Sequence, residues 1–342
     1  MTKNFWIRDD GRFHPYLYFI LIIFPIFCGI ISLYMGRMDI KISEIILLFK
    51  NFILKRELDP MMESLIFNIR LPRVLTALLV GSGLTAAGIS FQSLFSNPLA
   101  TPDILGVSSS ASLGAILGIL LSFGTMGIQM LALLTGLFSI FITINIVKKD
   151  ETSMMSLILA GIIVSSLANA LSSLLKYTAD PMDKLPQITY WLMGSFGRTS
   201  YKNLLLAGPL IIISIIVIYK MRWSLNILSL SEDEAISLGV NVKKTRLIFI
   251  FASTLITASS VSICGQIGWI GLIIPHLVRL IVGANNLYTL PLGLSLGAGF
   301  MVLIEAFSRT VSVIELPISI LTAILGAPIF IVLMRKSGGV IK

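Results

Sequence analysis

The sequence predicts an all-α, polytopic membrane protein with about ten transmembrane helices and both termini in the cytoplasm. Of its 342 residues, 56% are hydrophobic and only 13% are charged, and the mean hydropathy is +0.93. A water-soluble globule of this size needs more polar surface. The basic residues, which give a net charge of +9, stand singly or in pairs between long apolar runs. This pattern is typical of membrane topology and excludes a nucleic-acid-binding stripe.

The apolar runs define the predicted spans in order. Five precede a polar stretch and five follow it: 16–35, 74–95, 103–123, 127–147, 154–175, 203–220, 246–264, 268–283, 289–307 and 316–334. The first run is too long for a signal peptide and lacks a small-residue cleavage site, so we expect it to be retained. The run at 268–283 is the shortest. An even number of spans returns the chain to its starting side, and 1–342 is expected to form a single transmembrane domain.

Orientation depends on short basic loops. Lysine and arginine are nearly balanced between the two sides, but they are densest in the tight segments 148–149, 220–222, 243–246 and 335–336. Basic residues favour the cytoplasmic side of a membrane. We therefore expect these segments, and both termini, to lie in the cytoplasm.

The sequence predicts no catalytic residues, no metal site and no cofactor. Cys28 and Cys264 lie far apart inside apolar runs, which favours packing over a disulfide or a metal cluster. No Gly-Lys-Ser or Gly-Lys-Thr occurs, so the chain has no P-loop with which to hydrolyse ATP.

The polar segment 229–246 stands between two spans and is longer than a simple connection needs. Ser231 and Glu234 form a capping-box pattern, acidic residues fill the first turn, and Gly239 suits a left-handed C-terminal cap. A capped helix in water suggests a soluble partner, and a structured loop without a partner is the alternative. The residues of this predicted docking helix are Ser231, Glu232, Asp233, Glu234, Ala235, Leu238 and Gly239.

Few ionisable residues lie within the spans. Glu305 and Arg309 are four residues apart, on one helical face, and can pair with each other. His276 follows a proline within a span and is expected to be a hydrogen-bonded structural residue. A proton relay needs acidic partners at membrane depth, and apart from Glu305 the sequence offers almost none.

Several short motifs follow one another from residue 70 onwards. They are Arg70–Arg73 (RLPR), Asn97–Ala100 (NPLA), Leu105–Ser108 (LGVS), Trp191–Phe196 (WLMGSF), Gly268–His276 (GWIGLIIPH), Glu315–Pro317 (ELP) and Leu325–Pro328 (LGAP). In this order they resemble the permease subunit of the ABC importers for iron chelates, haem and vitamin B12. The resemblance runs from about Arg70 to Lys336.

This resemblance implies a multi-pass permease domain in the cell (inner or plasma) membrane. Such a permease translocates a bulky metal chelate, most often an iron–siderophore and otherwise haem or cobalamin, into the cytoplasm by ATP-driven alternating access. It is not an enzyme, because ATP and Mg²⁺ bind to a separate subunit. The implied partners are a second permease copy, two cytosolic ABC ATPase subunits and an extracytoplasmic binding protein. A homodimer is expected, with a heterodimer open, and segment 229–246 becomes the cytoplasmic coupling segment.

The resemblance also assigns three arginines to binding-protein docking. Arg70, Arg73 and Arg309 match positions on the outer face that pair with glutamates of the binding protein. For the first two, the alternative is a solvated helix end whose side chains reach the membrane interface. For Arg309, it is the pair with Glu305.

A cytoplasmic gate is the remaining assignment. It maps to Asn97 and Leu99 in one loop and, more loosely, to Thr152, Ser153 and Met154 in another. Asn97-Pro98 is otherwise a turn before a helix, with the proline at its first position.

Two other classes of function remain open at this point. An ion-gradient-driven secondary transporter requires intramembrane carboxylates or broken helices, for which Glu305 is the sole acidic candidate. A scaffold or receptor without transport leaves the gate and coupling motifs unexplained.

Overall fold

The structure, a computed structural model, describes residues 13–36, 38, 40–56, 59–147 and 154–336. These residues form helices and connecting turns, without a β-strand among them. The first half comprises α1 (Pro15–Tyr34), α2 (Ile42–Ile53), α3 (Pro60–Glu63), the π-helical η1 (Ser64–Arg70), α4 (Leu71–Leu94), the 3₁₀ turn η2 (Pro102–Leu105), α5 (Val107–Leu120), α6 (Thr125–Ile146) and α7 (Met154–Thr178). The second half comprises α8 (Lys184–Leu192), α9 (Tyr201–Lys220), α10 (Arg222–Ile227), α11 (Glu232–Ser237), α12 (Val242–Cys264), α13 (Ile270–Val282), α14 (Asn286–Thr310) and α15 (Ile318–Lys336).

The predicted all-α membrane fold is confirmed. Within the described ranges, seven helices are long and apolar enough to cross a bilayer, and three shorter apolar helices, Val107–Leu120, Ile270–Val282 and Ile318–Val332, coincide with the other predicted spans. The second predicted span begins earlier than expected, because α3, η1 and α4 continue as one helix from Pro60 to Leu94. Polar residues in η1 interrupt the apolar run that the sequence prediction relied on.

Three short helices between the spans were not predicted. These are α2, α8 and α10, which are too short to cross a membrane. In α2, the main-chain N–H of Lys41 donates to the Glu44 carboxylate, which caps the helix start, and Ile45 and Leu48 are buried on its inner face. The capping residue and the apolar positions of α2 can both be read in the sequence between the first two spans.

Helix α4 is the centre of the bundle and packs against α9, α12, α13 and α14. Two contacts bring backbones together where a side chain cannot fit. A Cβ at Gly88 would lie 2.0 Å from the carbonyl oxygen of Gly271, and one at Gly81 would lie 2.2 Å from that of Gly297. Small residues allow this approach in membranes, where no hydrophobic effect drives helix association.

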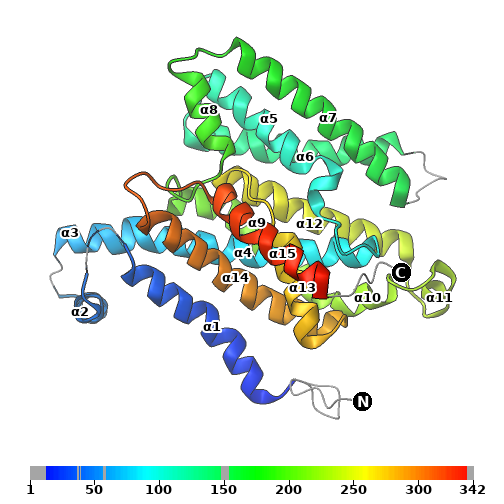
Figure 1. The fold of residues 1–342 in the computed structure, drawn as a ribbon, viewed down its shortest axis with the longest axis horizontal. Coiled ribbons are helices and arrows are strands. Elements are labelled where there is room, and N and C mark those ends of the chain that lie inside the picture. Colours follow the sequence, from blue (N-terminus) through cyan, green and yellow to red (C-terminus); the bar gives the residue numbers. More distant parts are fainter. Residues whose placement is uncertain (1–12, 37, 39, 57–58, 148–153, 337–342) are drawn as a thin grey trace.

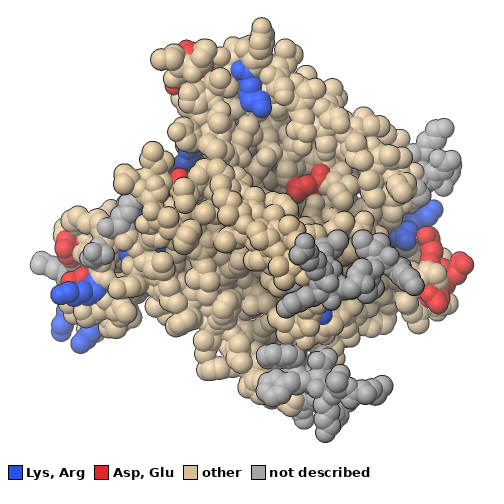
Figure 2. Space-filling model, viewed as in Figure 1, with Lys and Arg blue, Asp and Glu red and all other residues tan. Residues whose placement is uncertain are grey.

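Charged groups gather at the ends of the bundle. Figure 1 shows α2 and α3 at one end of the molecule and α11 at the other. On the face drawn in Figure 2, most coloured side chains lie near these ends and near α8, and the surface between them is largely uncharged. This distribution suits a protein whose middle is surrounded by lipid.

Cys28 and Cys264 are buried free thiols, as predicted.

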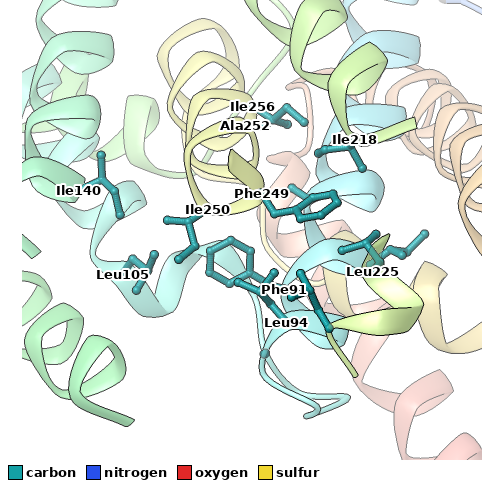
Figure 3. Close-up of a cluster of buried hydrophobic side chains, with 14 of the residues drawn as sticks. Phe91, Leu94, Leu105, Ile140, Ile218, Leu225, Phe249, Ile250, Ala252 and Ile256 are labelled. Carbon is teal, nitrogen blue, oxygen red and sulfur yellow. The ribbon is translucent and has the colours of Figure 1, made fainter. Parts of the chain in front are cut away.

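An apolar cluster packs the interior toward the α11 end of the bundle. Figure 3 shows its side chains from α4, η2, α6, α9, α10 and α12 pointing toward one another, with Phe91 and Phe249 fully buried. Ala235 of α11 belongs to the same cluster. The short helix is therefore attached to the core of the bundle.

Candidate functional site

Helix α11 forms as the sequence predicts. The Ser231 hydroxyl accepts from the Glu234 N–H at 3.4 Å, and the Glu234 carboxylate accepts from the Ser231 N–H at 3.0 Å, which completes the capping box. Glu232 and Asp233 occupy the first turn, and Gly239 follows the helix with φ +78°. Only glycine adopts this backbone conformation without strain.

Hydrogen bonds from Ser231 hold the pKa of Glu234 below its ordinary value. Since the lowered pKa belongs to the folded helix, the carboxylate stabilises the cap at neutral pH. This contribution is lost as the pH falls through that lowered pKa.

One side of α11 is anchored and the other faces outward. Ala235 is 1% exposed, and an ion pair of 3.2 Å joins Glu232 to Arg246 at the start of α12. In contrast, Ile236 and Leu238 are 58% and 54% exposed. A capped helix that presents two large apolar side chains beyond the end of the bundle is suited to insertion into another protein.

The loop with Asn97 and Leu99 lies at the same end. The Ser229 hydroxyl donates to the Ser93 carbonyl at 3.4 Å, which places the end of α4 beside the start of the coupling segment. The Asn97 side-chain oxygen accepts from the Leu99 N–H at 2.9 Å, and the Leu99 side chain is exposed. The predicted turn is present, but no helix begins at Pro98, since the next helical turn starts at Pro102.

The second predicted gate loop is described only in part. Met154 is half-buried at the first position of α7, whereas Thr152 and Ser153 lie outside the described residues. Met154 lines a cavity of about 280 Å³ together with Lys243 and Arg246 of α12. Both described segments of the predicted gate therefore lie at the α11 end.

Arg70 lies at the opposite end and is buried, 2% exposed. Its guanidinium donates to the Leu33 carbonyl at 2.6 Å and to the Met38 carbonyl at 3.0 Å. The side chain thus ties the long α3–η1–α4 helix to the end of α1 and the turn that follows it. The alternative of a solvated helix end does not hold for this residue.

Arg73 and Arg309 share one buried carboxylate. Glu305, 1% exposed, forms ion pairs with Arg73 at 3.1 Å and with Arg309 at 3.3 Å, and accepts a hydrogen bond from the Ser32 hydroxyl at 3.1 Å. Arg73 also makes a two-pronged pair with Glu315, at 2.9 and 2.5 Å. The predicted pairing of Glu305 with Arg309 is confirmed, and the buried Arg73 is no solvated helix end.

We refer to Arg70, Arg73, Arg309, Glu305 and Glu315 as the outer arginine cluster. It holds three guanidinium groups and two carboxylates, so it carries an excess positive charge. Within the described part of the chain, Nε and Nη1 of Arg309 have no hydrogen-bond acceptor. The cluster therefore holds buried hydrogen-bond donors that its own two carboxylates leave unused.

Some polar contacts were not anticipated. The sequence does not mark Ser32 or Glu315 as partners of the arginines, although Glu315 lies in the ELP motif. Gln92 accepts a hydrogen bond from Arg279 and donates one to the Gly271 carbonyl. His276 packs edge-on against Phe330, and its Nε2 has no hydrogen-bond partner among the described residues. The described residues contain no group of three potential metal ligands.

Comparisons with known proteins agree with this geometry. Residues 21–336 match the model of the FecCD transport family. The chain is 40% identical over 324 residues to the molybdate import system permease of Haemophilus influenzae, covering 94% of this chain and 96% of that protein. It is 36% identical to an iron chelatin transport system permease of Helicobacter pylori (87% and 90% covered) and to the vitamin B12 import permease of Escherichia coli (82% and 86%). A solved metal-chelate type ABC transporter in an inward-facing conformation superposes with a TM-score of 0.85 and 39% identity, covering 94% of this chain and all of that one.

Proposed function

Because the chain belongs to the FecCD transport family, we propose that it works as a dimer, with two cytosolic ATPase subunits and an extracytoplasmic binding protein. The chain itself is a multi-pass membrane permease of an ABC importer. This membership sets aside the ion-gradient-driven transporter and the scaffold. The observation that carries the proposal is the outward-facing apolar pair Ile236 and Leu238 on the capped helix α11.

ATP hydrolysis in this proposal takes place on the partner subunits. Because the sequence lacks a P-loop, the proposal assigns ATP and Mg²⁺ to the ATPase subunits and none of the cofactors to this chain. Closure of the ATPase dimer would push α11. Since α11 is joined to the core through Ala235 and to α12 through Arg246, this push would reach the helices around α4 and alternate the access of the central pathway.

The proposed substrate is a metal chelate of the iron–siderophore type. Relatives named for iron chelatin, hemin and vitamin B12 support this class. A small oxyanion is the second candidate, because the relative with 40% identity over 94% of this chain is named for molybdate. Uptake of radiolabelled ferric siderophore and of radiolabelled molybdate into proteoliposomes that contain the whole transporter separates the two candidates. Transport of neither compound would contradict both.

The gate proposal predicts a leak. Leu99→Ala removes an exposed apolar side chain from the loop after α4 and should widen the cytoplasmic closure. We expect a several-fold rise in ATP turnover without substrate, measured with the assembled transporter in nanodiscs. Leu121→Ala, an equally conservative change at an exposed position in the turn after α5, serves as the control. A tight transporter with unchanged basal ATP turnover would contradict a gating role for Leu99.

Docking of the binding protein on Arg70, Arg73 and Arg309 remains a proposal, and the excess positive charge of the outer arginine cluster supports it. In the described structure the arginines are engaged inside the chain, so carboxylates of the partner would have to replace internal acceptors. Among the carboxylates of the outer arginine cluster, Glu315 is the accessible acceptor, since its side chain is 31% exposed.

Glu315→Gln therefore tests the docking proposal. Removing the charge that competes for Arg73 should tighten binding of the binding protein, by up to about fivefold, the effect of a partly exposed ion pair. Affinity measured by biolayer interferometry on nanodisc-held transporter gives the answer. The control is Glu63→Gln, an exposed carboxylate on α3 at the same end. An affinity that does not rise would mean that Arg73 is purely structural.

A further inference from the structure

Helix α2 lies across the outer end of the bundle. Figure 1 shows it nearly end-on beside α3, whereas α1 and α4 run within the plane of the view. Its inner face is held by Ile45 and Leu48, which pack with Ile40 and Ile66. The helix therefore lies along the expected membrane surface, at the end opposite the coupling helix.

A groove separates α2 from the last turns of α1. Its volume of about 640 Å³ falls within the range of ligand pockets, roughly 300–1,000 Å³. Its wall is almost wholly apolar. The residues that matter here are Ile30 and Leu33 of α1 and Ile46, Phe49, Lys50 and Ile53 of α2.

The groove opens onto the lipid-facing side of α1. Along this span, Ile22, Ile26, Phe27 and Ile30 are 54–62% exposed, and their side chains carry no polar atom. Such a face suits contact with acyl chains, which offer no hydrogen-bond partners. Because Ile30 belongs both to this face and to the groove wall, a lipid tail can pass from one to the other without crossing polar surface.

Lys50 supplies the polar end of the site. It is the charged residue of the groove wall, its side chain is exposed, and it makes no ion pair within the described part of the chain. An amphipathic helix with apolar residues on one side and lysine at its edge is typical of elements in the headgroup layer. Because α2 follows the end of the span α1, we expect this ammonium group to lie near the lipid phosphates.

We propose that the groove between α1 and α2 binds one phospholipid of the outer leaflet. Its acyl chain lies along Ile30, Leu33 and Phe49, and its phosphate pairs with Lys50. The bound lipid fills the space that α2 leaves open and secures α2 to α1, next to the carbonyl groups of Leu33 and Tyr34 that hold Arg70. This proposal does not depend on the transported substrate.

Photolabelling locates the lipid. The full chain in nanodiscs is exposed to a phosphatidylglycerol whose acyl chain carries a diazirine, and the labelled peptides are identified by mass spectrometry. We expect labelling around Ile30 and Phe49 to exceed that of an ordinary lipid-facing surface, for which Phe19 and Ile22 of α1, outside the groove, are the internal reference. Equal labelling of both surfaces would mean that only annular lipid is present and would overturn the proposal.

Retention in detergent tests the role of Lys50. Native mass spectrometry should show one phospholipid kept per chain, and Lys50→Gln should weaken its retention about fivefold, the effect of one basic residue at a lipid surface. Lys202→Gln, which neutralises an exposed lysine at the start of α9, is the matched control. Ile46→Trp fills the groove without changing its charge and should also expel the lipid. Melting curves confirm that each variant is folded; retention equal to the control in both groove variants would refute the site.

Discussion

Glu305→Gln is expected to destabilise the protein more than any other single change in the charged network. The substitution leaves Arg73 and Arg309 buried without the carboxylate that they share. Breaking a buried pair by removing one partner costs about 3–5 kcal/mol. In a chain of this size the melting temperature should fall by roughly 4–7 °C, measured by differential scanning fluorimetry in detergent.

Two further variants separate charge from shape. Glu305→Asp keeps the charge and should recover part of the loss. Glu315→Gln, at a partly exposed position, should cost much less, because water replaces its carboxylate. If Glu305→Gln melted within about 2 °C of the unmodified protein, the network would not hold the outer end together.

Leu238→Asp is expected to abolish transport by preventing assembly with the ATPase. The leucine is exposed at the end of α11, and burying a charge in an apolar interface pocket is strongly unfavourable. A central interface residue contributes about 2 kcal/mol or more, so the affinity should fall at least thirtyfold. Co-purification and a titration with isolated ATPase measure the effect.

The control is the same change at the other end of the bundle. Leu121→Asp lies in the exposed turn after α5, is 60% exposed, and should leave ATPase binding unchanged. Because the capping box and Ala235 remain intact in the Leu238 variant, α11 itself should stay folded. Full assembly and full transport by Leu238→Asp would show that the partner binds elsewhere.

The long spans could be predicted because each is an uninterrupted apolar run that lipid requires. Helices that are short, or that extend an apolar run into polar sequence, were harder to predict. Helix α2 is short, with four polar residues among its twelve, and the α3–η1 extension of α4 carries polar residues such as Asn68 and Arg70 among its apolar ones. Their helical state is decided by packing against the rest of the bundle rather than by composition.

The two ends of the candidate site also differ in how far the sequence predicts them. Helix α11 was predictable because Ser231, Glu234 and Gly239 act within a few residues of one another. The burial of the arginines was not, since Ser32 and Glu305 are 273 residues apart and Arg73 and Glu315 are 242 apart. Only the folded chain brings these groups together, and no local pattern marks Ser32 as a partner.

The native mass of the complex, purified gently from its own membrane through a tag on this chain, tests the central claim most directly. The account predicts two copies of this permease with two copies of an ATPase subunit, and loss of that subunit from the Leu238→Asp complex. A chain that emerges without any ATPase from several mild detergents would contradict it.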